Sequence, residues 1–326
     1  MMNGTNSTDT HLPSSGYFIA LIIFACLCII VGIIGNIGVI AYNISMNHSK
    51  TPTTYFVVNL AISDIIVCLT FFPPWLVEFI SILTDREIMS HRLFCKVAFT
   101  SSFTSFALSV ANLMAINIDR CIFITKPLKY FQIMTWKKTY VWLVAIWVLT
   151  IVNANLLFFY TEEKTGRRLS CRIADPTRTI LCFFNIYIPS AGLLLLNYKI
   201  YKAAKNQRRK IRHESCTASN NDVKYESSDQ DVGLNATWKE KLRQLQTIKT
   251  YSIVVGVFYC CVSPVAILAF IRRDICKSFC IPISMSVAAA MLSGANSVMN
   301  PFVYSSRNKE YKIAYRQFCA RLFKGN

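Results

Sequence analysis

Charged side chains are scarce in this chain of 326 residues. Asp, Glu, Lys and Arg make up 16% of the sequence, whereas a soluble domain carries about 25%. Hydrophobic residues make up 53%, so the chain has ample apolar surface to bury, and this excludes an intrinsically disordered protein. The composition favours a protein that lies in lipid.

Charge is absent from stretches that are long enough to cross a membrane, for which a helix needs about 20 apolar residues. One stretch, 53–77, contains only Asp64, and six contain no charge at all: 17–42, 97–118, 139–161, 179–198, 250–271 and 278–306. A soluble all-α protein is the alternative, but its helices would show a polar face and these do not. Because unpaired backbone groups are not tolerated in lipid, the pattern predicts an all-α membrane protein with seven transmembrane helices.

Basic residues are unevenly divided between the two sides of these spans. Eleven of the 35 Lys and Arg residues fall on the side of the amino terminus and 24 on the other side. Positive charge marks the cytoplasm, so we expect a plasma-membrane protein with its amino terminus outside and its carboxy terminus inside. The net charge of +18 then suits anionic membrane lipids and acidic partners, and we expect no nucleic-acid binding.

The expected organisation has three parts. Residues 1–16 form an extracellular segment, residues 17–305 form the membrane domain, and residues 306–326 form a cytoplasmic amphipathic helix and tail. The first segment lacks a basic region and a cleavage site, so we expect no removable signal peptide. Asn3 and Asn6 open glycosylation sequons there.

The third cytoplasmic loop is the longest polar segment, covering about residues 203–246. It begins and ends with basic stretches, which we interpret as extensions of the flanking helices. Residues 215–231 are rich in Ser, Asn and Asp, and this composition favours disorder.

A charge within a membrane span is costly, so Asp64 is a functional candidate. Oxygen-bearing side chains in other spans are candidates to face it: Asn36, Ser109, Asn296, Ser297 and Asn300. Carboxylate, amide and hydroxyl oxygens suit a small hard cation such as Na⁺. The alternative is a hydrogen-bonded structural network around a protonated Asp64.

Short motifs follow one another through the spans. They are GNIGV at 35–39, LAISD at 60–64, Cys95 and Asp119-Arg120-Cys121 at the two ends of the third span, Trp147, Pro189, Phe258 with Pro264, and NPFVY at 300–304. In this order and on these spans, the chain resembles the rhodopsin-like G-protein-coupled receptors over residues 17–323. The resemblance implies a receptor that binds an extracellular ligand and activates a heterotrimeric G protein by outward movement of the sixth helix.

The resemblance also implies residue roles. Asp64, Ser109, Asn296, Ser297 and Asn300 match the sodium pocket of the family, and no other cofactor is expected. Arg120 would pair with Asp119 at rest and swing inward on activation. The complete set of activation residues would be Asp119, Arg120, Val110, Pro189, Phe258, Pro264, Asn300, Pro301 and Tyr304.

Three positions depart from the family pattern. Cys121 replaces the usual Tyr after Arg120, Val262 replaces an aromatic toggle, and Asn197 stands where a Tyr is usual. The last two departures keep open a second hypothesis, a weakly signalling interaction protein that modulates other receptors. A transporter is disfavoured because no repeat relates the halves, and an enzyme because no nucleophile with a base or metal cluster appears in the spans.

The resemblance implies a disulfide between Cys95 and Cys171. Cys276 and Cys280 flank a short outer loop and form either a second disulfide or two free thiols. Zinc is disfavoured because no His accompanies either pair at ligand spacing.

Apolar residues recur at helical spacing after Tyr304, which predicts an amphipathic helix on the inner leaflet. Cys319 on its apolar side is either a palmitoylation site or a plain buried Cys. Receptor kinases and arrestin are expected to act on hydroxyl residues of the third cytoplasmic loop: Ser215, Thr217, Ser219, Ser227 and Ser228.

The ligand is the least defined feature. Ser102 stands where amine receptors of the family place a carboxylate, and Gly294 where opsins carry the retinal-binding Lys, so we expect neither a monoamine nor retinal. The expected pocket is mostly apolar, which favours a small hydrophobic or lipid-like ligand. Glu78 offers an alternative as the cation partner of an amine, although such a residue is more often a solvated rim charge. The candidate lining residues are Trp75, Glu78, Phe99, Ser102, Phe103, Phe106, Phe184, Asn185, Val265, Ala266 and Ala290.

Overall fold

The structure is a computed structural model. It describes residues 13–45, 51–163, 169, 171–173, 180, 183–221, 249–268, 271, 282–307, 312–313 and 320.

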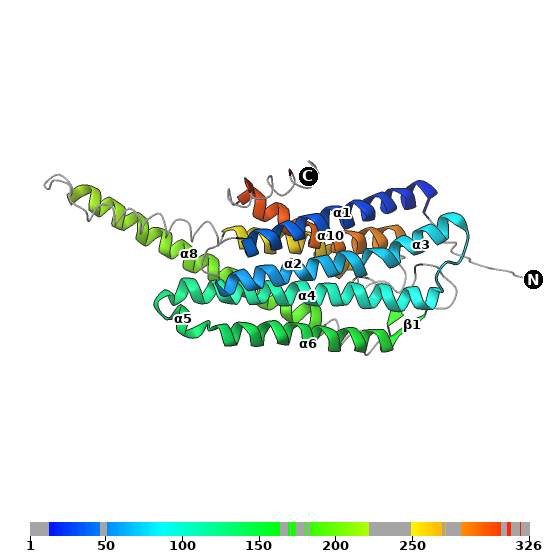
Figure 1. Cartoon of the computed structure of the whole chain (residues 1–326), viewed down its shortest axis with the longest axis horizontal. Helices are drawn as coiled ribbons and strands as arrows, with labels where there is room; N and C mark the ends of the chain where they lie inside the picture. Colours follow the sequence, from blue (N-terminus) through cyan, green and yellow to red (C-terminus); the bar gives the residue numbers. More distant parts are fainter. Residues whose placement is uncertain are drawn as a thin grey trace, which may run out of the picture.

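Long helices run side by side through the molecule and form one bundle (Figure 1). Helix α4 lies between α2 and α6 and also packs against α8, while α1 packs against α2 and α10. The helices are α1 (Ser15–Ser45), α2 (Pro52–Thr70), α3 (Phe72–Thr84), α4 (His91–Thr125), α6 (Trp136–Tyr160), α8 (Ile188–Asn221), the helix Lys249–Leu268 and α10 (Ile283–Arg307). Helix α3 continues the direction of α2, and the two together form one span. The described helices therefore correspond to the seven apolar stretches of the sequence.

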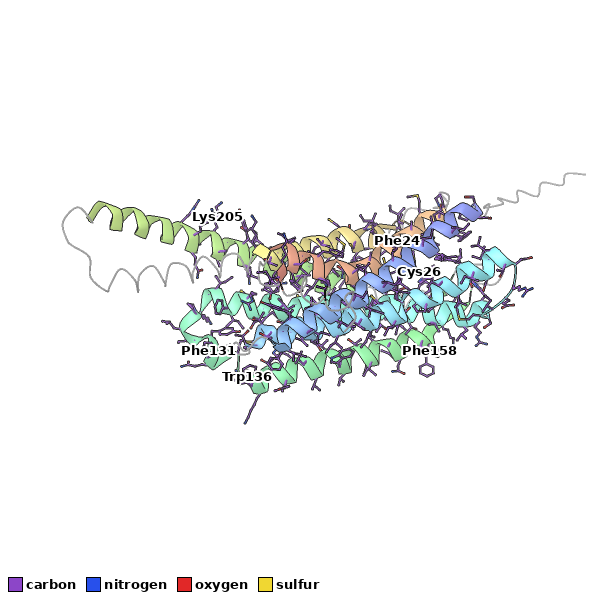
Figure 2. The ribbon with its side chains drawn as sticks, turned by 45° about the horizontal axis from the view of Figure 1, so that its top comes forward. Phe24, Cys26, Phe131, Trp136, Phe158 and Lys205 are labelled. Atoms are coloured by element: carbon purple, nitrogen blue, oxygen red, sulfur yellow. The ribbon has the colours of Figure 1, made fainter. Side chains whose placement is uncertain are left out.

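The outer surface of the bundle is apolar along much of its length. Figure 2 shows side chains pointing away from the helices, Phe158 and Trp136 among them, and both are exposed. Within the described residues, five helices are long and apolar enough to cross a membrane; α8 and α10 fall outside that set. A surface of this kind matches the hydrocarbon of a bilayer, where backbone groups must be paired within helices.

The second span is broken where α2 meets α3. Phe71 ends α2, and Pro73 and Pro74 follow in the first turn of α3. Proline has no backbone N–H and cannot complete the preceding helical turn, so the helix restarts there. The break turns Phe71 and Phe72 into the bundle, where both are buried.

Short elements close the two ends of the bundle. A 3₁₀ turn, η1 (Pro127–Lys129), and α5 (Tyr130–Ile133) join α4 to α6. At the other end, β1 (Thr161–Glu163) pairs antiparallel with β2 (Cys171–Ile173), and both strands contact α4. This hairpin, which the sequence does not predict, adds two short strands to the helical fold.

Helix α8 is longer than the sequence predicts. It follows a π-helical turn, η2 (Phe183–Tyr187), and runs to Asn221, so that its far end projects beyond the bundle (Figure 1). The prediction of disorder is therefore wrong for residues 215–221, which are helical. The basic helix upstream continues through these polar residues without a Pro or Gly to end it.

Candidate functional site

Asp64 lies at the centre of a buried polar group in the middle of the bundle. Its side chain is fully buried, and its Oδ2 atom accepts a hydrogen bond of 2.7 Å from the Asn300 amide. Asn36 donates to the carbonyl oxygens of Gly32 and Ser297, each over 2.9 Å. The structure therefore brings α1, α2 and α10 together through the polar residues that the sequence singles out.

This group leaves some of its own oxygens without a partner. Asp64 Oδ1, Asn36 Oδ1 and Asn296 Oδ1 are buried and make no hydrogen bond within the described part of the chain. A buried polar atom without a partner costs about 1–3 kcal/mol. Three buried acceptor oxygens of these polar residues therefore have no donor among the described residues.

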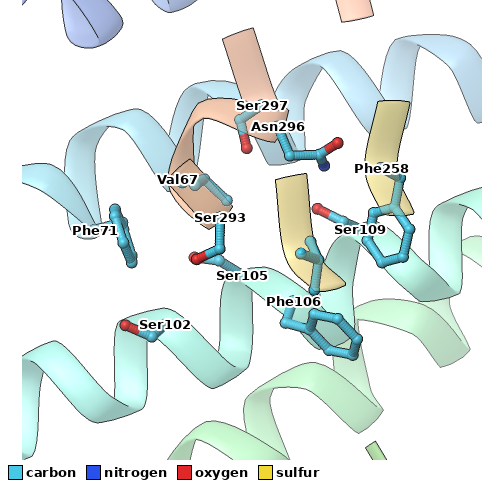
Figure 3. A pocket seen from close by; sticks show the side chains of 12 residues that line it. Val67, Phe71, Ser102, Ser105, Phe106, Ser109, Phe258, Ser293, Asn296 and Ser297 are labelled. Carbon is cyan, nitrogen blue, oxygen red and sulfur yellow. The ribbon is translucent and has the colours of Figure 1, made fainter. Parts of the chain in front are cut away.

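A small cavity opens between α2, α4, α10 and the helix Lys249–Leu268 (Figure 3). Its volume of about 20 Å³ is enough for about one water molecule. Its lining residues are Val67, Phe71, Ser102, Ser105, Phe106, Ser109, Phe258, Val262, Ser293, Gly294, Asn296 and Ser297. Half of these residues carry a hydroxyl or amide group.

Gly294 allows one wall of this cavity to form. A Cβ atom at this position would lie 2.4 Å from Cε1 of Phe71 and 3.0 Å from Cζ of Phe72. Only a residue without a side chain lets α10 approach the break between α2 and α3 this closely.

The cavity joins two sites that the sequence analysis kept apart. It includes Ser102 and Phe106 from the expected ligand pocket, and Ser109, Asn296 and Ser297 from the expected sodium pocket. The expectation of a mostly apolar lining does not hold for this cavity, because the serines of α4 and α10 face it. Val262, which stands where the family usually has an aromatic residue, also lines the cavity.

The other expected pocket residues lie elsewhere. Phe99 and Phe103 stack on each other beside Leu157 of α6, and Trp75 packs among the aromatic rings of Phe71, Phe79 and Phe94. Phe184 is exposed, whereas Val265, Ala266 and Ala290 are partly buried outside the cavity lining. Asn185 belongs to η2, and its side chain lies outside the described part.

Glu78 is buried rather than solvated. Its side chain lies in α3 with 3% of its surface exposed, so the interpretation as a solvated rim charge is wrong. It does not line the cavity.

A second buried carboxylate, Asp119, lies near the carboxy-terminal end of α4. Its Oδ1 accepts from the Tyr130 hydroxyl over 2.7 Å, and its Oδ2 accepts from the Thr53 hydroxyl over 2.5 Å. Burial raises the pKa of Tyr130, and the Asp119 charge raises this pKa further. The phenol therefore remains a hydrogen-bond donor at physiological pH.

Arg120 is held by this cluster and by two aromatic rings. Its Nη2 atom lies 3.5 Å from Asp119 Oδ2 and also donates to the Thr53 hydroxyl. The guanidinium carbon lies 5.6 Å from the centre of the Phe123 ring and 5.3 Å from that of Tyr251. The pairing of Arg120 with Asp119 is the arrangement that the resemblance implies for the resting state.

The expected switch residues near the middle of the bundle share one apolar core. Val110, Phe258 and Tyr304 are buried in the same cluster, and the Phe258 ring lies 5.6 Å from that of Phe106. Pro189 and Pro264 are partly buried, and Pro301 is buried inside α10. Asn197 donates to the Leu193 carbonyl of its own helix over 3.3 Å.

Cys95 is disulfide-bonded, and β2, which contacts α4, begins at Cys171. The pairing of these two residues stays a prediction. The remaining predicted modification sites lie outside the described residues: Asn3, Asn6, Cys276, Cys280, Cys319, Ser227 and Ser228. Ser215, Thr217 and Ser219 belong to α8, but their side chains are likewise not described.

Comparison with known proteins places these features in a family. Residues 35–304 match the family model of the 7 transmembrane receptor (rhodopsin family). The chain belongs to this family. Its members are receptors rather than enzymes, with an extracellular ligand and a G protein as partners, and this receptor is accordingly a multi-pass membrane protein.

Relatives cover almost the whole receptor. The alpha-1A adrenergic receptor of Oryzias latipes is 27% identical over 97% of this chain and 70% of its own length. The octopamine receptor beta-2R of Chilo suppressalis is 26% identical over 98% and 84%, and the human histamine H2 receptor is 24% identical over 99% and 86%.

Several residues of the cavity and of the Asp119–Arg120 cluster are not among those predicted from the sequence. Ser105 and Ser293 could have been found, because they continue the helical spacing of Ser102 and Asn296 along one face of each span. Thr53, Tyr130 and Tyr251 carry no such signal, since only the folded bundle brings them to Asp119 and Arg120.

Proposed function

We propose that this receptor is switched by a small extracellular ligand that acts through the helix Lys249–Leu268. One observation carries the proposal: this helix lines the cavity with Phe258 and Val262 and holds Arg120 through Tyr251. A ligand that displaces Phe258 and Val262 would move this helix and so disturb the contact between Tyr251 and Arg120. Outward movement of the helix would free Arg120 to receive a G protein.

We propose a polar ligand rather than a lipid-like one. The serine hydroxyls and the Asn296 amide make half of the cavity lining, and an apolar occupant would leave these groups without hydrogen bonds. The relatives described above are named as receptors for adrenergic agents, octopamine and histamine. They give no support to the expectation of a non-monoamine ligand, and Glu78, the alternative cation partner, lies outside the cavity lining.

Na⁺ is proposed as a second occupant of the polar group around Asp64. The residues fit the ion, because three buried oxygens of Asp64, Asn36 and Asn296 lack hydrogen-bond partners within the described part of the chain. Asp64, Asn296 and the hydroxyl of Ser109 would hold it. A bound Na⁺ would supply the positive charge that a buried carboxylate requires.

The orientation and remaining partners are also proposed. The excess of basic residues supports an extracellular amino terminus and a cytoplasmic carboxy terminus, with the exposed Lys202 and Lys205 of α8 near anionic lipid. Receptor kinases and arrestin would act on the hydroxyl residues of the third cytoplasmic loop. Unchanged arrestin recruitment after replacement of Ser215, Thr217, Ser219, Ser227 and Ser228 by Ala would contradict that assignment.

G-protein dissociation in cells tests the main proposal. The intact receptor and an Arg120→Ala variant are compared at equal surface level, without ligand and with a panel of small extracellular compounds. We expect a signal that disappears with Arg120→Ala. If neither protein signals through any G-protein class, the weakly signalling interaction protein is favoured. Asn197 keeps this hypothesis open, because its amide donates to a carbonyl of its own helix.

A further inference from the structure

Two apolar side chains stand exposed on the short connection between α4 and α6. Leu128 of η1 and Phe131 of α5 are 96% and 73% exposed, and no other large hydrophobic side chain of the described residues is more exposed than Leu128. They are three positions apart, so they lie on one side of a helical turn. Tyr130, in the same turn, is buried. The connection is therefore amphipathic, and the described part of the receptor leaves its apolar side uncovered.

The exposed apolar side chains continue onto the outer face of α6. Trp136 and Tyr140 are exposed, and their ring centres lie 5.1 and 6.0 Å from that of Tyr55 in α2. Figure 2 shows Phe131 and Trp136 at the same end of the bundle. Trp and Tyr are enriched where the hydrocarbon of a bilayer meets its headgroups. This boundary is therefore expected at the start of α6, close to α5 in the chain.

Positive charge surrounds the apolar side chains. Lys126, Lys129, Lys137 and Lys138 are exposed, and residues 121–161 contain no Asp or Glu. The cytoplasmic leaflet carries anionic lipids, and each Lys near its surface strengthens binding about fivefold. Apolar side chains between basic ones are typical of segments that lie in the interface of a membrane. Charge and apolar surface therefore both match an anionic leaflet.

This connection also contacts Asp119. Tyr130 packs edge-on against Phe131, with ring centres 5.1 Å apart, and its hydroxyl donates to Asp119 Oδ1 over 2.7 Å. The Lys138 ammonium donates to the Ile133 carbonyl at the end of α5 over 3.0 Å, which ties α5 to the start of α6. A displacement of α5 would therefore act on the hydrogen bond between Tyr130 and Asp119.

We propose that η1 and α5 bind the cytoplasmic leaflet, with Leu128 and Phe131 inserted below the headgroups and the four lysines on anionic phospholipids. The bound lipid holds α5 where Tyr130 reaches Asp119, so anionic lipid stabilises the resting arrangement. This goes beyond the proposed function and shares with it only the cytoplasmic orientation of this end. A protein partner is the alternative occupant, but the lysines and the continuous aromatic surface of α6 favour lipid.

Photo-crosslinking of the purified full-length receptor tests the binding. Phe131→benzoylphenylalanine is placed in nanodiscs of equal parts phosphatidylcholine and phosphatidylserine, illuminated, and its adducts are identified by mass spectrometry. We expect lipid adducts in which phosphatidylserine predominates. Val144→benzoylphenylalanine, on the exposed face of α6, is the matched control and should give lipid adducts without that excess. Leu128→benzoylphenylalanine is a second probe of the same surface.

Three results of this experiment would overturn the proposal. The first is the absence of lipid adducts at both probes, and the second is a lipid ratio equal to that at Val144. The third is adducts that form only when a G protein is added, which would assign the surface to a protein partner.

Charge variants test the role of the lysines. The double change Lys126→Gln and Lys129→Gln should lower the ratio of phosphatidylserine to phosphatidylcholine adducts at residue 131 at least about fivefold. Arg208→Gln with Arg209→Gln, which removes the same charge from exposed positions of α8, should leave the ratio unchanged. An unchanged ratio in the lysine variant would show that these lysines do not bind the lipid.

The link to Asp119 has its own readout. Phosphatidylserine should raise the unfolding midpoint of the native receptor in nanodiscs. Tyr130→Phe should keep the lipid adducts but lose most of this rise, because the ring remains and the hydroxyl that bonds Asp119 is gone. An equal rise in the two proteins would contradict the link.

These results are separable from the signalling test. A receptor that signals through Arg120 but shows no excess of phosphatidylserine at residue 131 keeps the proposed function and loses this inference. A receptor that binds anionic lipid there but never activates a G protein does the reverse.

Discussion

Two fully buried aspartates lie in the same bundle, and their surroundings differ. Asp119 has both carboxylate oxygens hydrogen-bonded, by Tyr130 and Thr53, and Arg120 lies beside it. Asp64 has one oxygen bonded, by Asn300, and the other has no partner in the described part of the receptor. The protein itself supplies donors to both oxygens of the first carboxylate, whereas one oxygen of the second has no donor within the described residues.

The two carboxylates should therefore have different roles. Asp119 holds its neighbours in one arrangement, whereas Asp64 is the candidate to bind a cation. A satisfied buried charge holds its neighbours in one arrangement, because each partner would be left unpaired if the arrangement broke. An unsatisfied one favours whatever supplies the missing contact. A change at Asp119 should therefore keep the response of the receptor to added Na⁺, and a change at Asp64 should abolish it.

The largest effect is expected for Asp119→Ala. This change leaves Arg120 without its carboxylate at a nearly buried site, and breaking a buried pair in this way costs about 3–5 kcal/mol. We expect a lower unfolding midpoint and raised basal G-protein activation, with an unchanged response to Na⁺. Asp119→Asn, which keeps one acceptor oxygen, should lose less. If Asp119→Ala had the same unfolding midpoint as the native receptor, the contacts of Asp119 would not stabilise the bundle.

Asp64→Asn should produce the inverse pattern. An amide oxygen can replace the carboxylate as acceptor for Asn300, so the unfolding midpoint in the absence of Na⁺ should be unchanged. The negative charge that attracts the ion, however, is lost. Na⁺ at 100 times its Kd stabilises a protein by about 2.7 kcal/mol, and this gain should disappear. Midpoints in sodium and in choline chloride measure it. A variant that still gains from sodium would contradict the ion site.

Tyr130→Phe removes one of the two hydroxyls that satisfy Asp119, with an expected loss of about 1–3 kcal/mol. The raised pKa of Tyr130 adds a pH signature. Its contribution is fully present below the unfolded-state pKa of Tyr, about 10, and is lost as the pH rises above this value. The difference in unfolding midpoint between native receptor and variant should therefore be constant from pH 6 to about pH 9 and shrink above about pH 10. A difference that changes near neutral pH would assign the effect to another group.

The smallest effect is expected for Tyr251→Leu, which removes the ring over Arg120. Cation–π contacts contribute about 0.5–2 kcal/mol. We expect basal G-protein activation to rise severalfold, whereas Tyr251→Phe, which keeps the ring, should behave as the native receptor. Equal basal activity in the two variants would mean that the ring does not hold Arg120.

The sequence predicts the bundle well because its signal is local. A charge-free stretch of sufficient length indicates a span whatever its neighbours, and a lone Asp64 in such a stretch indicates a functional site. The contacts of Asp119 are a different matter. Thr53 and Tyr130 are ordinary residues at the edges of other elements, and only the packing of α2, α4 and α5 brings their hydroxyls to the carboxylate. Phe184 is a further case: the sequence favours a pocket residue, whereas its side chain in η2 is exposed.

The close approach of α10 to the break between α2 and α3 determines how mutation can change the cavity. Gly294 touches Phe71 so closely that the smallest possible side chain, a methyl group, would displace the ring. Phe71 is part of the cavity wall, so one added carbon atom would reshape the space without altering any hydrogen-bonding group. The shape of the cavity is therefore adjustable by a change of a single carbon atom at one position of its wall.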